Sequence, residues 1–421
     1  MTSKTSHDGL GIGSDQDLTA SVAAILQASG ESTSVTLAAV DRMNTGLGTD
    51  FGFIPAWTAV AVTDRASPQL GGPRVVNAAP TGISMGAVAA LMKTIDRMGN
   101  GSAGRLELVA ALKDAKQARP ANLWAFLLAC ATGAGALAVI FGAQDVTAVA
   151  LAAGSAVVGG VARRLLGHIH VGPLGQVFAA AFVAGIIGGI AVNADLSSSL
   201  RLIAVCPAMI LVPGPHILNG TLDLLALRIP LGAARLGYAT LVLLSVGAGL
   251  AIALTIFGTG LPTDPPGRTI PFWVDFIAAG VAAASYPVYF AMPYRYTLWP
   301  VAIGAVAHGL RWFAMSALGL NIVIGAFIAC LFVGAVLAPI AHQRHIPFAG
   351  IGFAAVVSLV PGVFVFRAID ALGSLPFGGS SAVLLGGISD ATTAVSIILA
   401  MAIGLAVPMH VYGRAKRKTR A

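Results

Sequence analysis

Two proline–glycine interruptions of apolar segments are the parts of this sequence best suited to binding chemistry. The first is Leu211–Val212–Pro213–Gly214, and the second is Leu359–Val360–Pro361–Gly362, 148 residues later. Proline removes an amide donor and clashes one turn back, so neither stretch can continue an α-helix undisturbed. In a membrane, the freed backbone groups must find partners in protein or in a water-filled cavity. The candidate site residues at the breaks are therefore Pro213, Gly214, Pro361 and Gly362.

Polar and ionisable side chains follow each break. His216, Asn219 and Asp223 follow the first, whereas Arg367 and Asp370 follow the second. Ionisable groups inside membrane spans are costly and are functional candidates by default. Asp223 lies about two and a half turns beyond the first break, where burial favours the neutral carboxyl group, so we predict that it binds and releases a proton. Alternatives stay open: Asp223 could simply meet water at a helix end, His216 or Asp370 could titrate instead, and Arg367 could extend to the membrane surface.

The composition places these breaks in a membrane protein. Of 421 residues, 57% are hydrophobic and 10% are charged, whereas charged residues make up about a quarter of an ordinary soluble domain. The net charge of +8 lies largely in the C-terminal tail and in short loops, which is typical of membrane orientation and not of nucleic-acid binding. Cys130, Cys206 and Cys330 lie in apolar runs without metal-ligand spacing, so neither a metal nor another cofactor is expected.

Ten apolar segments predict ten membrane-spanning helices. They are Asn122–Phe141, Val146–Val161, Pro173–Val192, Leu200–Leu227, Leu236–Gly258, Pro271–Phe290, Leu298–Leu318, Ile322–Ala341, Phe348–Arg367 and Ser381–Met409. Alternate loops are rich in arginine, so both chain ends are predicted on the cytoplasmic side of the membrane. The broken segments are the fourth and the ninth, which correspond if the helices form two five-helix repeats. Because five is odd, the second repeat would be inverted, an architecture typical of secondary transporters.

The first 120 residues predict a small α+β domain outside the membrane. The expected elements are helices at Asp17–Ser29 and Ser32–Asn44, one strand over Phe51–Thr63 broken at Pro55, a weaker strand at Arg74–Ala78, and helices at Ser84–Met98 and Leu106–Gln117. His7 is the only histidine before His168, so a Ser-His-Asp triad within this domain is not expected. We therefore predict a regulatory or structural role for it.

The expected division of the chain follows from these patterns. It comprises a flexible leader at 1–16, a cytoplasmic domain at 17–120, the first membrane repeat at 121–260, the second at 261–410, and a basic cytoplasmic tail at 411–421.

These features together resemble the threonine/serine exporter family, ThrE. The resemblance rests on Gly30–Glu31–Ser32–Thr33, on Ala79–Pro80–Thr81–Gly82–Ile83, and on the two Val-Pro-Gly breaks, the first followed by Asn219–Gly220–Thr221–Leu222–Asp223. It implies export of small polar amino acids across a bacterial cytoplasmic (inner) membrane, driven by the proton gradient. The expected partners are then a small polar amino acid, protons and the lipid bilayer, and a homo-oligomer is left open. Two alternatives also remain: export of a small dicarboxylate, as in relatives split over two chains, and a membrane-anchored enzyme acting through the N-terminal domain.

Overall fold

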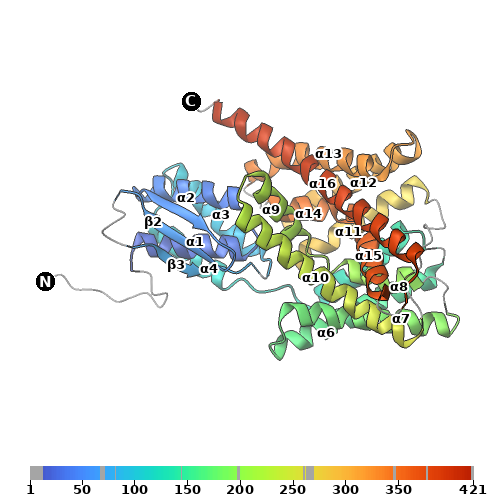
Figure 1. The fold of residues 1–421 in the computed structure, drawn as a ribbon. Coiled ribbons are helices and arrows are strands. Elements are labelled where there is room, and N and C mark those ends of the chain that lie inside the picture. The colour runs from blue at the N-terminus through green and yellow to red at the C-terminus, as the bar shows by residue number, and fades with distance from the viewer. Residues whose placement is uncertain are drawn as a thin grey trace.

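A small mixed domain lies beside a larger, entirely helical body in the computed structural model (Figure 1). The structure describes residues 13–66, 72–80, 82–143, 145–196, 200–258, 261, 270–344, 348–375 and 378–418. The two parts have separate hydrophobic cores. The N-terminal domain packs against the end of the body formed by α9 (Gly214–Leu225), one of the helices that follow a break (Figure 1).

The N-terminal domain consists of four helices and a three-stranded antiparallel sheet in the order β1-β2-β3. The elements are α1 (Asp15–Ala28), α2 (Thr33–Leu47), β1 (Phe51–Pro55), β2 (Ala59–Asp64), β3 (Arg74–Asn77), α3 (Met85–Gly99) and α4 (Arg105–Lys116). All four predicted helices are confirmed to within three residues. The Ser32 side chain caps α2 by accepting a hydrogen bond from the Val35 amide, as expected for a serine at a helix start.

The prediction of one long strand broken at Pro55 is wrong. Pro55 ends β1, and the chain turns so that Phe51 pairs with Asp64 in an antiparallel hairpin. Proline has no amide to continue a ladder, and the turn is closed by the Ala56 amide, which donates to the Ala59 carbonyl at 2.9 Å.

The helical body follows the predicted apolar segments. Its helices are α5 (Leu123–Ile140), α6 (Val146–His168), α7 (Pro173–Asn193), α8 (Leu200–Met209), α9 (Gly214–Leu225), α10 (Ile229–Ile256), α11 (Phe272–Tyr289), α12 (Leu298–Ser316), α13 (Ile322–Arg344), α14 (Phe348–Val356), α15 (Gly362–Ser374) and α16 (Ser381–Lys418). Four helices extend well beyond the predicted segments: α6 continues past Val161, α10 begins before Leu236, α15 continues past Arg367 and α16 past Met409. Arg163, Arg164, Arg235 and Asp370 therefore lie within helices and not in loops.

Within the described residues, seven helices are long and apolar enough to cross a membrane, namely α5, α6, α7, α10, α11, α13 and α16. Two bent pairs, α8 with α9 at 54° and α14 with α15 at 67°, raise the number of candidate spans to nine. The remaining predicted span is α12, which has 19 residues and carries His308 and Arg311, two polar side chains that lower its mean hydropathy. Both predicted breaks are thus confirmed as bends.

Helix contacts in the first half of the body recur in the second half. α5 packs on α6, α6 on α7, and α7 on α10, while α11 packs on α12, α12 on α13, and α13 on α16. The bent pairs contact each other reciprocally, since α9 touches α14 and α15 touches α8. The starts of α11, α13, α14 and α15 follow those of α5, α7, α8 and α9 by 148 or 149 residues.

Candidate functional site

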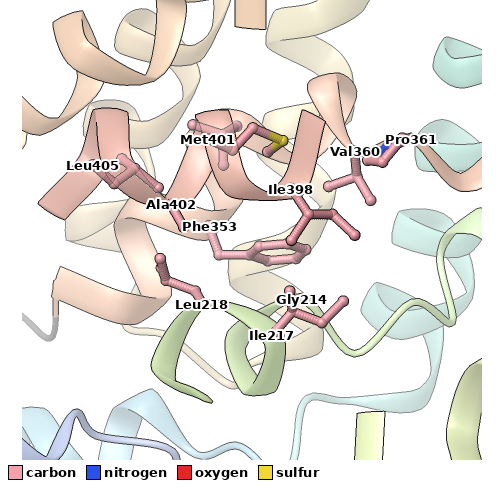
Figure 2. Close-up of a pocket in the computed structure, with 11 residues that line it drawn as sticks. Gly214, Ile217, Leu218, Phe353, Val360, Pro361, Ile398, Met401, Ala402 and Leu405 are labelled. Atoms are coloured by element: carbon pink, nitrogen blue, oxygen red, sulfur yellow. The ribbon is translucent and has the colours of Figure 1, made fainter. Parts of the chain in front are cut away.

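The two helix breaks lie close together in the body. Gly214 and Pro361 line one apolar cavity of about 390 Å³, shared with Phe353 and Met401 (Figure 2). Gly214 packs against the Phe353 ring of α14, and a Cβ atom at Gly362 would lie 2.8 Å from Met209 Cγ in α8. Each glycine therefore touches the first half of the opposite bent pair, and the absence of a side chain permits that approach.

The first break releases two backbone carbonyls. Pro215 has no amide to donate to the Leu211 carbonyl. The Gly214 amide donates to the Val212 carbonyl at 2.9 Å, so the Ile210 carbonyl loses the donor that a continuous helix would supply. Both Ile210 and Leu211 line a second and larger cavity, where free carbonyls can accept hydrogen bonds from a ligand.

The second break has the same backbone geometry as the first. Pro361 has φ −79° and ψ 44°, close to φ −82° and ψ 57° at Pro213. The Gly362 amide donates to the Val360 carbonyl at 2.8 Å. The two matching tetrapeptides thus adopt matching conformations.

The larger cavity lies beside the first break and encloses about 800 Å³, within the range of about 300–1,000 Å³ typical of small-ligand sites. Pro213, Pro215 and His216 contribute one wall of it. The polar side chains on its other walls are Arg163, Tyr238, Tyr286 and Tyr289. This cavity therefore brings polar side chains next to the first break.

The N-terminal domain lies over this cavity. Gly82 and Ile83, from the Ala-Pro-Thr-Gly-Ile motif, are among its lining residues. The Trp57 ring lies 5.2 Å from the Tyr238 ring and 6.3 Å from the His216 ring, between centroids. The domain therefore covers one side of the cavity with Gly82 and Ile83, and its Trp57 completes an aromatic cluster with His216 and Tyr238.

Asp223 lies in the contact between the two domains. Its carboxylate is 3.2 Å from Arg235 Nε and 3.2 Å from Arg228 Nη1, and it accepts a hydrogen bond from the Thr33 hydroxyl at 3.0 Å. Arg235 is 1% exposed, and a cation so deeply buried requires a carboxylate partner. Asp223 therefore neutralises buried arginine and anchors α2, and it does not line the open cavity.

The Gly-Glu-Ser-Thr motif provides further contacts at this boundary. The Asn219 side-chain amide donates to the Gly30 carbonyl at 3.0 Å. Glu31 is 1% exposed, and its carboxylate accepts from the Ser32 amide at 2.7 Å. Burial raises the pKa of Glu31 to about 7, although the Ser32 hydrogen bonds and the nearby Arg235 charge act in the opposite direction. A buried carboxyl group that titrates near neutral pH thus lies next to the Asp223 cluster.

Arg367 and Asp370, the candidate residues after the second break, lie away from the cavity beside the first break. Arg367 Nε lies 2.9 Å from the Asp390 carboxylate of α16, so Arg367 is paired between helices and does not extend freely to the membrane surface. The Asp370 carboxylate accepts from the Leu261 amide at 3.1 Å. Neither residue lines the cavity beside the first break, because both lie in α15 beyond the second break.

Three further groups emerge from the folded structure. Arg163 and Arg235 have the signature of loop arginines in the sequence, but they lie in α6 and α10. His308 Nε2 lies 3.1 Å from the Asp275 carboxylate, and the other ring nitrogen of His308 lies 2.9 Å from the Ser358 hydroxyl. This group joins α11 and α12 to the second break.

The fold and the site together define a polytopic helical membrane protein with two crossed broken helices, an arrangement typical of secondary transporters. More particularly, the chain belongs to the threonine/serine exporter family. A family model described as "Putative threonine/serine exporter" matches residues 17–257, and one described as "Threonine/Serine exporter, ThrE" matches residues 275–411. The first match ends just after α10 and the second begins within α11, so their boundary divides the helical body into its two halves. No solved structure matches the chain significantly.

Proposed function

We propose that this protein is a secondary transporter that exports small polar amino acids of the threonine and serine type, coupled to the proton gradient. The observation that carries the proposal is the cavity at the first break, where two backbone carbonyls lack their helical donors. A zwitterion needs acceptors for its ammonium group and donors for its carboxylate. Free carbonyls, arginine and tyrosine hydroxyl groups supply both kinds of partner within one cavity.

The proposed mechanism of transport uses two inverted repeats of five spans each, with α12 as the seventh span. The recurring helix contacts and the constant offset of 148 or 149 residues support this arrangement. Substrate would bind near the crossing of the bent pairs, and one repeat would rock against the other to expose it alternately to each side. Both chain ends would then face the cytoplasm, with the N-terminal domain over the inner opening.

For proton coupling, Asp223 remains the proposed group. A proton on its carboxylate would weaken its pairing with Arg235 and its hydrogen bond from Thr33 at the same time. Protonation would thereby loosen the N-terminal domain where it covers the cavity. His216, in the aromatic cluster, and Asp370 are the next candidates, as the sequence predicts.

Efflux from proteoliposomes tests this function. Vesicles that contain the full chain are loaded with labelled threonine, serine or succinate and are placed in medium that is more acidic than the lumen. We expect threonine and serine efflux that accelerates with the pH difference and falls to the level of protein-free vesicles when a protonophore is added. Preferred efflux of succinate would instead identify a dicarboxylate exporter. Chemical conversion of the substrate without movement would point to a membrane-anchored enzyme.

A further inference from the structure

Arg163 is a cation in the cavity without an acidic partner. It lies in α6, is partly buried, and lines the cavity beside the first break. Within the described part of the chain, no carboxylate or hydrogen-bond acceptor pairs with its guanidinium group. An arginine at membrane depth is costly unless it is paired or faces a polar cavity. Among the described residues nothing neutralises this charge, which leaves it open to an external anion or to water.

The neighbouring Arg164 has a structural role. Arg164 donates to the Ala121 carbonyl at 2.9 Å, and its guanidinium group lies 4.5 Å from the centre of the Phe126 ring. Successive helix residues point about 100° apart, so these two arginines face different surroundings. Arg164 fixes the start of α5, whereas Arg163 faces the cavity with its donors unused.

Two tyrosine side chains lie near the Arg163 guanidinium group. Tyr238 and Tyr289 both line the cavity and lie close enough to Arg163 to interact with it electrostatically. The Tyr289 hydroxyl is buried beside the Cys130 thiol, a weak partner, and makes no hydrogen bond of ordinary geometry to the described residues. An unpaired hydroxyl donor next to an unpaired guanidinium group suits a carboxylate, which accepts hydrogen bonds through both oxygens.

We propose that Arg163 binds the carboxylate group of the transported amino acid, with the Tyr289 hydroxyl as a second donor. The Ile210 and Leu211 carbonyls, in the same cavity, then face the ammonium group. The proposal rests on the transport function above and adds to it the residue that recognises the substrate carboxylate. A second carboxylate would find only His216 as a further basic side chain among the described lining residues, which favours a monocarboxylate.

The second repeat holds a matched arginine that is already neutralised. Arg311 stands 148 residues after Arg163, the separation of Pro213 from Pro361. The Asp275 carboxylate of α11 lies near Arg311 and offsets its charge. The residue 148 positions before Asp275 is Leu127, so the first repeat carries no carboxylate at the position equivalent to Asp275. Arg163 and Arg311 thus differ in their anion: the Asp275 carboxylate of the protein neutralises Arg311, whereas Arg163 is left for a ligand.

Binding of threonine and threonine amide to the purified full-length protein tests this assignment. The amide keeps the ammonium and hydroxyl groups but has no carboxylate. We expect wild-type protein to bind threonine roughly 10- to 100-fold more tightly than the amide, the range for a charge-assisted hydrogen bond. Arg163→Gln should bind both compounds with equal, weak affinity, and Arg163→Lys should retain part of the preference.

Arg164→Gln is the matched control, since it removes the same charge one residue away and should keep the wild-type preference. Arg163→Gln that still prefers threonine to its amide as strongly as wild type would overturn the assignment while leaving the transport function standing. Wild-type protein that binds neither compound would instead overturn the proposed function itself. If Arg163→Gln does not fold, Arg163→Lys provides the test. A preference for threonine over its amide that equals the wild-type preference would contradict carboxylate binding by the arginine guanidinium group.

Discussion

The backbone of Gly214 lies against one edge of the Phe353 ring, and no side chain fits between them. This contact joins the first broken helix to the first half of the second one. The Phe353 ring also lies 5.6 Å from the Tyr286 ring, between centroids, and Tyr286 borders the larger cavity. The two breaks and the cavity are therefore mechanically connected through one aromatic side chain.

Replacement of Gly214 by alanine should disturb this crossing. The added methyl group would overlap the Phe353 ring, and we expect destabilisation of about 1–3 kcal/mol, as for other overpacked sites, together with reduced efflux. Thermal unfolding in detergent and efflux from vesicles measure the two effects. In the double variant, Phe353→Leu should partly restore the stability and efflux that Gly214→Ala loses. Gly386→Ala, at a helical glycine with open space around it, is the control, and equal behaviour of the two alanine variants would refute the packing argument.

Replacement of Asp223 should affect both coupling and domain docking. Asp223→Asn leaves Arg235 buried beside an uncharged amide, and loss of one partner of such a pair costs about 3–5 kcal/mol. We expect a lowered melting temperature and loss of uphill efflux, while exchange of substrate across the membrane persists. Asp223→Glu should be partly tolerated.

Thr33→Val provides the milder test of docking alone, because it removes the hydroxyl donor and keeps the ion pairs. It should increase proteolytic cleavage between Lys116 and Leu123 without abolishing uphill efflux.

Normal uphill efflux by Asp223→Asn would exclude Asp223 as the coupling group.

Glu31 should make stability depend on pH. Its pKa is raised to about 7 in the folded protein from an ordinary value of 4.5, so the folded state binds the proton more tightly than the unfolded state does. The resulting stabilisation is complete below pH 4.5 and is lost as the pH rises from there to about 7. This loss amounts to roughly 3 kcal/mol of unfolding free energy at most. The melting temperature of wild type should therefore fall over this pH range, and that of Glu31→Gln should fall less. Asp41→Asn, at an exposed carboxylate of α2, should leave the decline unchanged.

The membrane topology can be checked with cysteine labelling from either side of intact cells. Both chain ends should be protected until the membrane is opened, whereas cysteines placed at Gly258 and Gly378 should react from outside. Residues at the two ends of α12 should label from opposite sides, because the ten-span arrangement requires this helix to cross. Labelling of both ends from one side would reduce the number of spans and remove the inverted repeat.

The sequence predicts the elements of this protein better than their contacts. Helices α1 to α4 follow from amphipathic periodicity and caps, and both bends follow from proline and glycine, because these signals are local. The contact between Thr33 and Asp223 joins residues 190 positions apart. No local pattern reports such a contact, since it depends on how two folded surfaces match.

Arginine positions illustrate the same limit within the membrane body. Arg235 precedes the predicted span at Leu236 and looks like a loop cation, but α10 begins at Ile229 and takes Arg235 inside. Its charge is tolerated there because Asp223 lies next to it on α9. Arg163 was missed for the same reason, as the predicted end of its helix was too early. The burial of a charge depends on partners that the one-dimensional pattern does not reveal.

The docking of the N-terminal domain also imposes an order on biosynthesis. The domain leaves the ribosome first and can fold as a unit, but its partners at Asn219 and Phe290 are made much later. The Met85 amide donates to the Phe290 carbonyl at 2.8 Å, so this bond can form only after α11 has been inserted. Until then the surface around Gly30 and Met85 stays uncovered. Docking of the domain would therefore mark the moment at which the nascent chain has completed its helices as far as α11.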